Sequence, residues 1–169
     1  MSSSKLRRLS AILFLGSALG LAGCQVTPLY AERPAGEVAL TEAIYIEEVD
    51  DRVAQQLRNE LIFLFNGGQR QPDNPRFSMT LETEQRMIAI LRDSNTGEAT
   101  GQNLQVLARY KLTDVRTGEQ VFVHAQRVTT TFDRFEQGFA DILAERDAQN
   151  RAARELAERI QADLAIALE

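Results

Sequence analysis

Hydrophobic and polar residues alternate in two stretches along the middle of the chain, as they do in strands that bury one face, and a third stretch is rich in the β-favouring residues Val, Thr and Phe. These stretches cover residues 77–91, 104–113 and 121–132. In the first of them, Phe77, Met79 and Leu81 alternate with polar residues, and the pattern becomes less regular toward its end. Turn-forming residues separate the stretches at positions 93–97 and 114–118. We therefore predict two consecutive hairpins, which make a three-stranded antiparallel meander.

Two other stretches place apolar residues at helical spacing. The first covers residues 51–66, begins beside two aspartates that can cap a helix, and ends at glycines that tolerate positive φ. The second runs from Gly138 to residue 169. Its apolar residues share one face and are Phe139, Ile142, Leu143, Ala153, Leu156, Ala157, Ile160 and Leu164. We predict an amphipathic helix for each stretch.

A further strand is predicted over residues 38–48, where apolar side chains and the β-favouring Tyr45 precede the first helix. The element order is then β-α-β-β-β-α. Two amphipathic helices that cover one face of a four-stranded sheet make an α+β two-layer sandwich. We assign this single domain to residues 37–169, and no internal repeat is evident in it.

The N-terminal segment has a different pattern, which is that of a secretory signal peptide. Basic residues among the first eight positions precede an uncharged, apolar run over residues 9–21. That run is shorter than the ~20 residues that a membrane-spanning helix needs. It ends in Leu21-Ala22-Gly23-Cys24, which resembles the lipobox of bacterial lipoproteins. Residues 1–23 are therefore the predicted lipoprotein signal peptide.

Cys24 is the only cysteine, so a disulfide within the chain is excluded. In lipoproteins the thiol of this cysteine receives a diacylglyceryl group, the chain is cleaved before it, and the new amine is acylated, commonly with palmitate. The resemblance predicts lipidation at Cys24, followed by a lipid-anchored tether over residues 24–36; a chance cysteine is the alternative. Because Gln25 is not the aspartate that retains enterobacterial lipoproteins in the inner membrane, we expect the periplasmic face of a Gram-negative outer membrane.

The composition of the chain after the signal peptide limits the kinds of partner that the domain is expected to bind. The 146 residues that follow it are enough for one domain with a sizeable core. The whole chain carries −5, and the signal peptide has three basic and no acidic residues, so the mature part carries −8. Such an acidic domain does not favour nucleic acid as a partner. Except for Lys111, its basic residues are arginines, which suit pairing with phosphate, although a GC-rich genome explains the same bias.

The sequence contains no pattern that supports catalysis or metal binding. His124 is the only histidine and lies in a predicted strand, where a packing or surface role is expected. With one histidine and a lipidated cysteine, the chain lacks a nucleophile–histidine arrangement and a set of metal ligands. We predict no catalytic residue, no metal and no cofactor beyond the covalent lipid. A lipid-anchored enzyme would need a pocket with convergent titratable groups.

Basic residues of the predicted meander are candidates for binding an anion. If the first hairpin turns near residues 96–101, Arg86 and Arg109 lie nearly opposite each other, and opposed like charges favour an anion between them. Lys111 lies further along the same strand as Arg109. The alternative is that each cation pairs with a nearby glutamate, such as Glu82 or Glu84, or faces water.

Four segments lie in this order along the chain: "CQVTPLY", "RVAQQLRNELIFLF", "YKLTDVRTGEQVF" and "FADILAERDAQNRAARELAERIQADLA". Together they resemble the alphaproteobacterial form of the LPS-assembly lipoprotein family LptE. The segment "CQVTPLY" is similar to the family's Cys-Gly-Phe-x-Pro-Leu-Tyr start and departs from it at Gln25 and Val26. "RVAQQLRNELIFLF" is similar to the first helix, and "YKLTDVRTGEQVF" to the third strand, its turn and the fourth strand. "FADILAERDAQNRAARELAERIQADLA" is similar to the C-terminal helix. The resemblance covers most of the chain after Cys24.

The resemblance implies a lipoprotein that sits inside the large β-barrel LptD, plugs it and assists its assembly, so that the two place lipopolysaccharide in the outer leaflet. Family members also bind lipopolysaccharide through basic residues. The candidates here are Arg86, Arg109 and Lys111, whose cations can pair with phosphate. The expected partners are an LptD-type barrel, lipopolysaccharide and, through Cys24, the membrane. The alternative is an auxiliary lipoprotein of a lipid-transport ATPase system or a cell-wall synthase activator.

Overall fold

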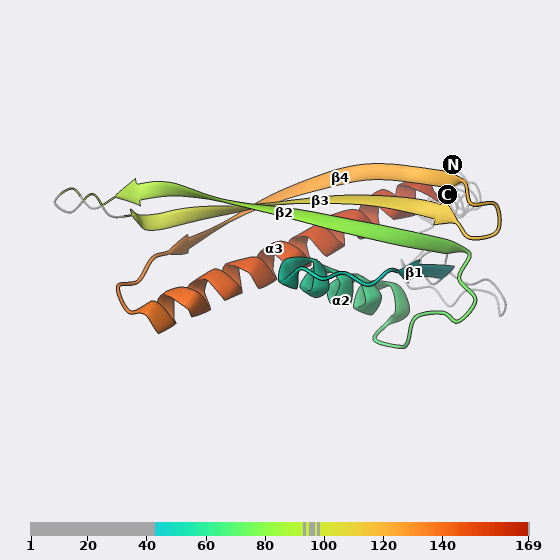
Figure 1. The fold of residues 1–169 in the computed structure, drawn as a ribbon, viewed down its shortest axis with the longest axis horizontal. Helices are drawn as coiled ribbons and strands as arrows, with labels where there is room; N and C mark the ends of the chain where they lie inside the picture. Colours follow the sequence, from blue (N-terminus) through green and yellow to red (C-terminus); the bar gives the residue numbers. More distant parts are fainter. Residues whose placement is uncertain (1–42, 93, 95–96, 98, 169) are drawn as a thin grey trace, which may run out of the picture. The chain divides into compact units, whose positions relative to one another are not determined.

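The helices and strands of the described residues follow one another in the predicted order β-α-β-β-β-α (Figure 1). The structure, a computed structural model, describes residues 43–92, 94, 97 and 99–168. Its elements are β1 (Ile44–Ile46), α2 (Arg52–Asn66), β2 (Phe77–Arg92), β3 (Ala99–Asp114), β4 (Gln120–Asp133) and α3 (Gly138–Ala167). The predicted signal peptide and tether, including Cys24, lie outside the described residues.

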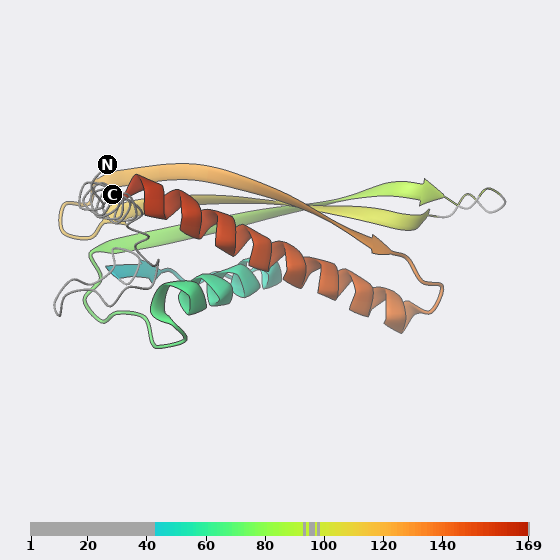
Figure 2. The ribbon, with the colours of Figure 1, turned by 180° about the vertical axis from the view of Figure 1, so that it is seen from behind.

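The four strands form one sheet in the order β1-β2-β3-β4. β1 pairs with β2 in parallel, whereas β2, β3 and β4 pair antiparallel as two consecutive hairpins. Both helices lie on the same face of the sheet (Figures 1 and 2). The α+β fold, its two layers and the predicted meander are therefore confirmed.

The first strand is shorter than predicted. The prediction covered residues 38–48, of which 38–42 lie outside the described residues and only Ile44–Ile46 form β1. The backbone N–H of Glu47 still donates to the carbonyl oxygen of Met79 at 2.9 Å, and beyond it the chain leaves the sheet for the start of α2. The guanidinium Nε of Arg58 in α2 donates to the carbonyl oxygens of Ile46 and Glu47 at 3.2 and 2.9 Å. The alternation of apolar residues marked this strand, but its end depends on where the chain turns toward α2.

Local residues set both ends of α2. The carboxylate of Asp51 accepts hydrogen bonds from the backbone N–H groups of Val53 and Ala54 at 3.0 and 3.1 Å, which is the arrangement of a helix N-cap. At the other end Gly67 has φ of +60°, a conformation that glycine adopts without steric cost. The sequence predicted both ends correctly because each depends on residues a few positions apart.

The core lies between the sheet and the two helices. Its fully buried side chains include Ile44, Ile46, Val53, Leu57, Leu61, Met79, Leu104, Val106, Leu112, Leu156, Ile160 and Leu164. These positions alternate along the strands and recur at helical spacing in α2 and α3, as the sequence pattern requires. Most residues of the observed core are therefore those that the pattern predicted to be buried.

The first turns of α3 are the exception. Five of the eight residues on its predicted apolar face are buried, and these are Ala153, Leu156, Ala157, Ile160 and Leu164. Phe139, Ile142 and Leu143 are instead 76%, 50% and 48% exposed. The reason is the length of α2: its first residue, Arg52, bonds to the side chain of Gln149, so the turns of α3 before Gln149 extend past it (Figure 2).

Candidate functional site

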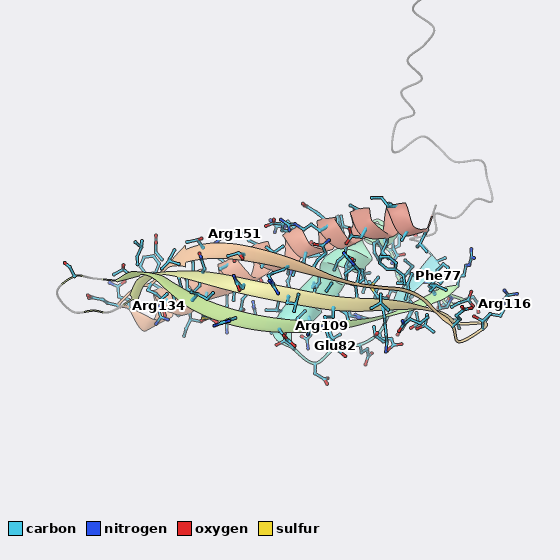
Figure 3. All side chains as sticks on the ribbon, turned by 90° about the horizontal axis from the view of Figure 1, so that it is seen from above. Phe77, Glu82, Arg109, Arg116, Arg134 and Arg151 are labelled. Carbon is cyan, nitrogen blue, oxygen red and sulfur yellow. The ribbon has the colours of Figure 1, made fainter. Side chains whose placement is uncertain are left out.

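The candidate functional site is the face of the sheet that points away from the helices. None of the described elements covers this face (Figures 1 and 3). Because side chains alternate between the faces of a strand, the buried residues of β3 assign the others to this outer face. Arg109 and Lys111 flank the buried Tyr110 and therefore both lie there, as does Arg86 through its pairing with Gln105.

The register aligns the outward-facing side chains in cross-strand rows. From β2 through β3 to β4 these rows are Thr80–Lys111–Val123, Glu82–Arg109–Ala125, Glu84–Leu107–Arg127 and Arg86–Gln105–Thr129. Arg109 lies opposite Glu82 (Figure 3), so the expectation that it faces Arg86 is wrong. The hairpin turn lies between Arg92 and Ala99, earlier than that expectation assumed, and the register of both strands shifts with it.

Arg109 is engaged by a carboxylate. Its guanidinium lies 2.5 Å from a carboxylate oxygen of Glu84, and the two side chains are 48% and 64% exposed. The hydrogen bond and the charge of Arg109 lower the pKa of Glu84. Exposed ion pairs of this kind add little to the stability of a fold, because water screens the attraction. For Arg109, pairing with a nearby glutamate, the alternative to an anion site, is therefore the arrangement that the structure shows.

The other cations of this face are free to meet a ligand. Arg86 and Lys111 are exposed and form no ion pair with any other described residue. Arg127 is also exposed and has no ion pair with another described residue. It lies in the row next to that of Arg109, and the sequence analysis did not select it as a candidate. Its odd-numbered position in β4, shared with the other outward residues, is the signal that could have identified it.

A polar cluster joins α3 to the inner face of the sheet. The hydroxyl of Tyr110 and the amide of Gln126 donate to the same oxygen of Asp163 at 2.5 and 2.7 Å. His124 lies 3.9 Å from that oxygen and is half-exposed. Its ring also packs edge-on against Tyr110, with centroids 6.1 Å apart. The expectation that His124 has a packing or surface role agrees with this position.

Ionisation of the Tyr110 phenol should make the stability of the fold depend on pH in the alkaline range. Burial, with the hydrogen bond to Asp163 adding to it, raises the pKa of the Tyr110 phenol well above the ordinary value of about 10. A raised folded-state pKa contributes stability that is complete below the unfolded-state pKa and is lost as the pH rises above it. We expect the free energy of unfolding to fall progressively as the pH rises above about 10.

Denaturant titrations across this range would measure that fall. Tyr110→Phe should be destabilised near pH 8 by about 1–2 kcal/mol, because Asp163 loses a donor, and should lose most of the alkaline dependence. Tyr45→Phe on β1 is the matched control, since it changes a tyrosine outside the cluster. Equal pH dependence in the Tyr110→Phe variant and the unsubstituted protein would contradict the prediction.

The described residues also bear on two other classes of site. Across residues 43–92 and 99–168, no three His, Cys, Asp or Glu side chains are grouped so that they could hold a metal ion. None of the helices in this part of the chain combines the length and the apolar character that a membrane crossing requires. The candidate site on the outer sheet face therefore consists of the side chains described above.

Comparison with known proteins gives one family match. The family described as "LptE: Lipopolysaccharide-assembly" matches residues 41–164, which include every described helix and strand. Comparison with curated protein sequences gives no match.

Three solved structures have a similar fold. A protein from Caulobacter crescentus CB15, assigned as a lipoprotein, is 26% identical, with a TM-score of 0.62 over 75% of this chain and 90% of that one. A minor lipoprotein from Acinetobacter baumannii is 17% identical, with a TM-score of 0.52 over 73% and 88% of the two chains. Rare lipoprotein B from Shewanella oneidensis is 13% identical, with a TM-score of 0.53 over 72% and 91%. At these identities the last two show the fold alone.

Proposed function

Because the chain belongs to the LptE family of lipopolysaccharide-assembly proteins, we propose that it is an outer-membrane lipoprotein that plugs an LptD-type β-barrel and assists its assembly. A role in lipopolysaccharide assembly follows from the family. The family match over residues 41–164 is the observation that carries the proposal, since it spans both layers of the fold. The lipids of Cys24 would hold the protein at the periplasmic face of the outer membrane.

The outer sheet face is compatible with a place inside a barrel. Its rows combine charged and polar side chains, such as Glu82, Arg109 and Thr129, with few large apolar ones. The lumen of a large outer-membrane barrel is polar, so a charged and hydrogen-bonding surface can lie against it without loss of hydration. In this role the protein needs no catalytic group, and we propose that it is not an enzyme.

A pull-down in mild detergent tests the barrel partnership. The tagged, lipidated protein is recovered from outer membranes and its partners are identified by mass spectrometry. We expect a large β-barrel protein in near-equal amount to the tagged chain. Recovery of an inner-membrane ATPase complex or of a cell-wall synthase, with no barrel, would contradict the proposal and support the auxiliary or activator role instead.

Lipopolysaccharide binding is the finer part of the proposal. Arg86 and Lys111 are exposed cations without an ion pair in the described residues. Arg127 lies in the row of Glu84, which is between the rows of Arg86 and Arg109. Cations of this kind can pair with the phosphates of the lipid. We propose Arg86, Lys111 and Arg127 as its direct contacts, with Arg109 exchanging Glu84 for a phosphate.

Charge reversal of the free cations tests this part. The double variant Arg86→Glu/Lys111→Glu is expected to bind lipopolysaccharide roughly tenfold more weakly, because two attractive contacts become repulsive. Binding of the purified protein to labelled lipopolysaccharide measures the loss. The control Arg70→Glu/Arg154→Glu makes the same change in net charge at exposed positions outside the outer sheet face. Equal affinity of the two variants would refute binding at this face.

A further inference from the structure

The helical layer covers only part of the sheet. α2 lies under β1 and the first part of β2, and its cap, Asp51, accepts a hydrogen bond from Thr83. α3 lies under β4 and is twice as long, with 30 residues against 15. Beyond Thr83, β2 continues for nine residues with no helix of the described chain beneath it (Figures 1 and 2). Among the described residues, the space in line with α2 is therefore unoccupied at this end.

Apolar side chains border this unoccupied space. Met87 belongs to the helix-facing set of β2, since it pairs with the buried Leu104, yet it is 41% exposed. Phe139, Ile142 and Leu143 lie on the first turns of α3, the helix that flanks this part of the sheet, and are 48–76% exposed. We call these four residues the open corner. Three large apolar side chains that are exposed on the same turns of a helix mark an interaction site.

The α3 residues of the open corner share a face of the helix with an existing interface. On the face of α3 that starts with Phe139, the polar residues Arg146, Gln149 and Asn150 separate the exposed apolar residues from Ala153, Ala157 and Leu164, which are fully buried. The second half of α3 is the part beside α2, as the bonds from Arg52 to Gln149 and Asn150 show. Among the described residues, this face is thus covered by a helix in its second half and exposed in its first turns.

The charges at the border restrict the occupant. Two ion pairs, Arg134–Asp141 and Arg151–Asp147, neutralise most of the charge around the first turns of α3. The remaining residues from position 134 to 151 are Glu136, Glu145 and Arg146, which leave a net negative border. An anionic membrane surface attracts basic borders, so it fits this site poorly. A second copy of the chain would oppose one acidic border to another.

We infer that the open corner is a docking site for a protein segment, helical or extended, that lies in line with α2. The segment presents apolar side chains to Phe139, Ile142 and Met87 and carries lysine or arginine toward Glu136 and Glu145. The inference rests on the proposed function only in taking the barrel as the protein that supplies the segment. Apolar anchors with a complementary charged rim are the usual composition of such interfaces.

Photo-crosslinking in outer membranes tests the inference on the full lipidated chain. A photo-reactive phenylalanine analogue replaces Ile142 in one variant and Ile166, which is 77% exposed near the end of α3, in the control. We expect the analogue at position 142 to capture a protein, with the linked peptide containing apolar residues beside lysine or arginine. We expect a roughly tenfold lower yield from position 166, where no apolar stripe continues.

A pair of double variants gives a second readout. Phe139→Ser/Ile142→Ser should recover roughly tenfold less of the partner in the pull-down than Phe63→Ser/Ile166→Ser, because hot-spot residues carry most of the binding energy. All four residues are at least 50% exposed, so both variants should keep the unfolding midpoint of the unsubstituted protein. The comparison therefore separates loss of docking from loss of folding.

Other outcomes would overturn the inference. These are a crosslink from position 142 to lipid alone, a crosslink to a second copy of the chain, or equal partner recovery by the two double variants. If the unsubstituted chain recovers the barrel under any of these outcomes, the proposed function stands while the docking site is wrong. If position 142 instead captures a protein other than a barrel, the docking site stands and the barrel partnership is wrong.

Discussion

Replacing Cys24 with alanine is expected to remove all acyl mass from the protein and to lower its amount in the outer-membrane fraction. Cys24 is the only cysteine, so no other thiol can receive the diacylglyceryl group. Each buried CH₂ of an acyl chain contributes about 0.8 kcal/mol, and two or more chains are needed for stable anchoring. Without them, binding to the proposed barrel is the one predicted contact that would keep the chain at the periplasmic face of that membrane.

Membrane fractionation and intact-mass measurement check this prediction. The matched control is Thr27→Ala, which changes a residue of the predicted tether but leaves Leu21-Ala22-Gly23-Cys24 intact. The control should carry the mass of a triacylated or diacylated cysteine and remain with the outer membrane. If the control carries no acyl mass, or if the Cys24→Ala protein carries the same acyl mass as the control, the lipoprotein assignment is wrong.

Leu156→Ala is expected to lower the free energy of unfolding by about 2–5 kcal/mol. Leu156 is fully buried in the half of α3 that packs against α2 and the sheet. Truncation removes apolar contacts and leaves a cavity that the surrounding core can fill only in part. Single domains have a total stability of about 5–15 kcal/mol, so this loss is a large fraction of the whole.

Equilibrium unfolding in urea, followed by circular dichroism, measures the loss. Ile166→Ala in the same helix is the control, because Ile166 is 77% exposed and its truncation should change stability by less than about 0.5 kcal/mol. Similar unfolding midpoints for the two variants would mean that α3 does not pack on the core at Leu156 as described.

Burial in α3 shows where sequence patterns are sufficient and where they are not. The helical spacing correctly placed Leu156 and Phe139 on one face, since spacing depends only on the geometry of a single helix. It could not show that Leu156 would be fully buried and Phe139 76% exposed. That difference depends on the length of α2, a separate element that must first pack beside α3.

The candidate site shows the same limit. Strand alternation placed Arg109 and Lys111 on one face of β3 correctly, but it carried no information on which residues of β2 and β4 lie opposite. The assumed turn position therefore put Arg86 opposite Arg109, where the structure has Glu82, and left Arg127 unselected. A shift of a few residues in one turn changes every cross-strand pair of the hairpin.

By itself, the sequence determined the signal peptide and lipobox prediction, the order of helices and strands, and local features such as the Asp51 cap and the Gly67 end of α2. These depend on residues that are close together along the chain. Only the tertiary structure decided the register of the sheet, which pairs Arg109 with Glu84 and leaves Arg86 and Lys111 without an ion pair in the described residues. It also decided which apolar residues of α3 are exposed at the open corner. Those features arise where separate elements meet, and their positions depend on turn placement and relative helix length, which no local pattern encodes.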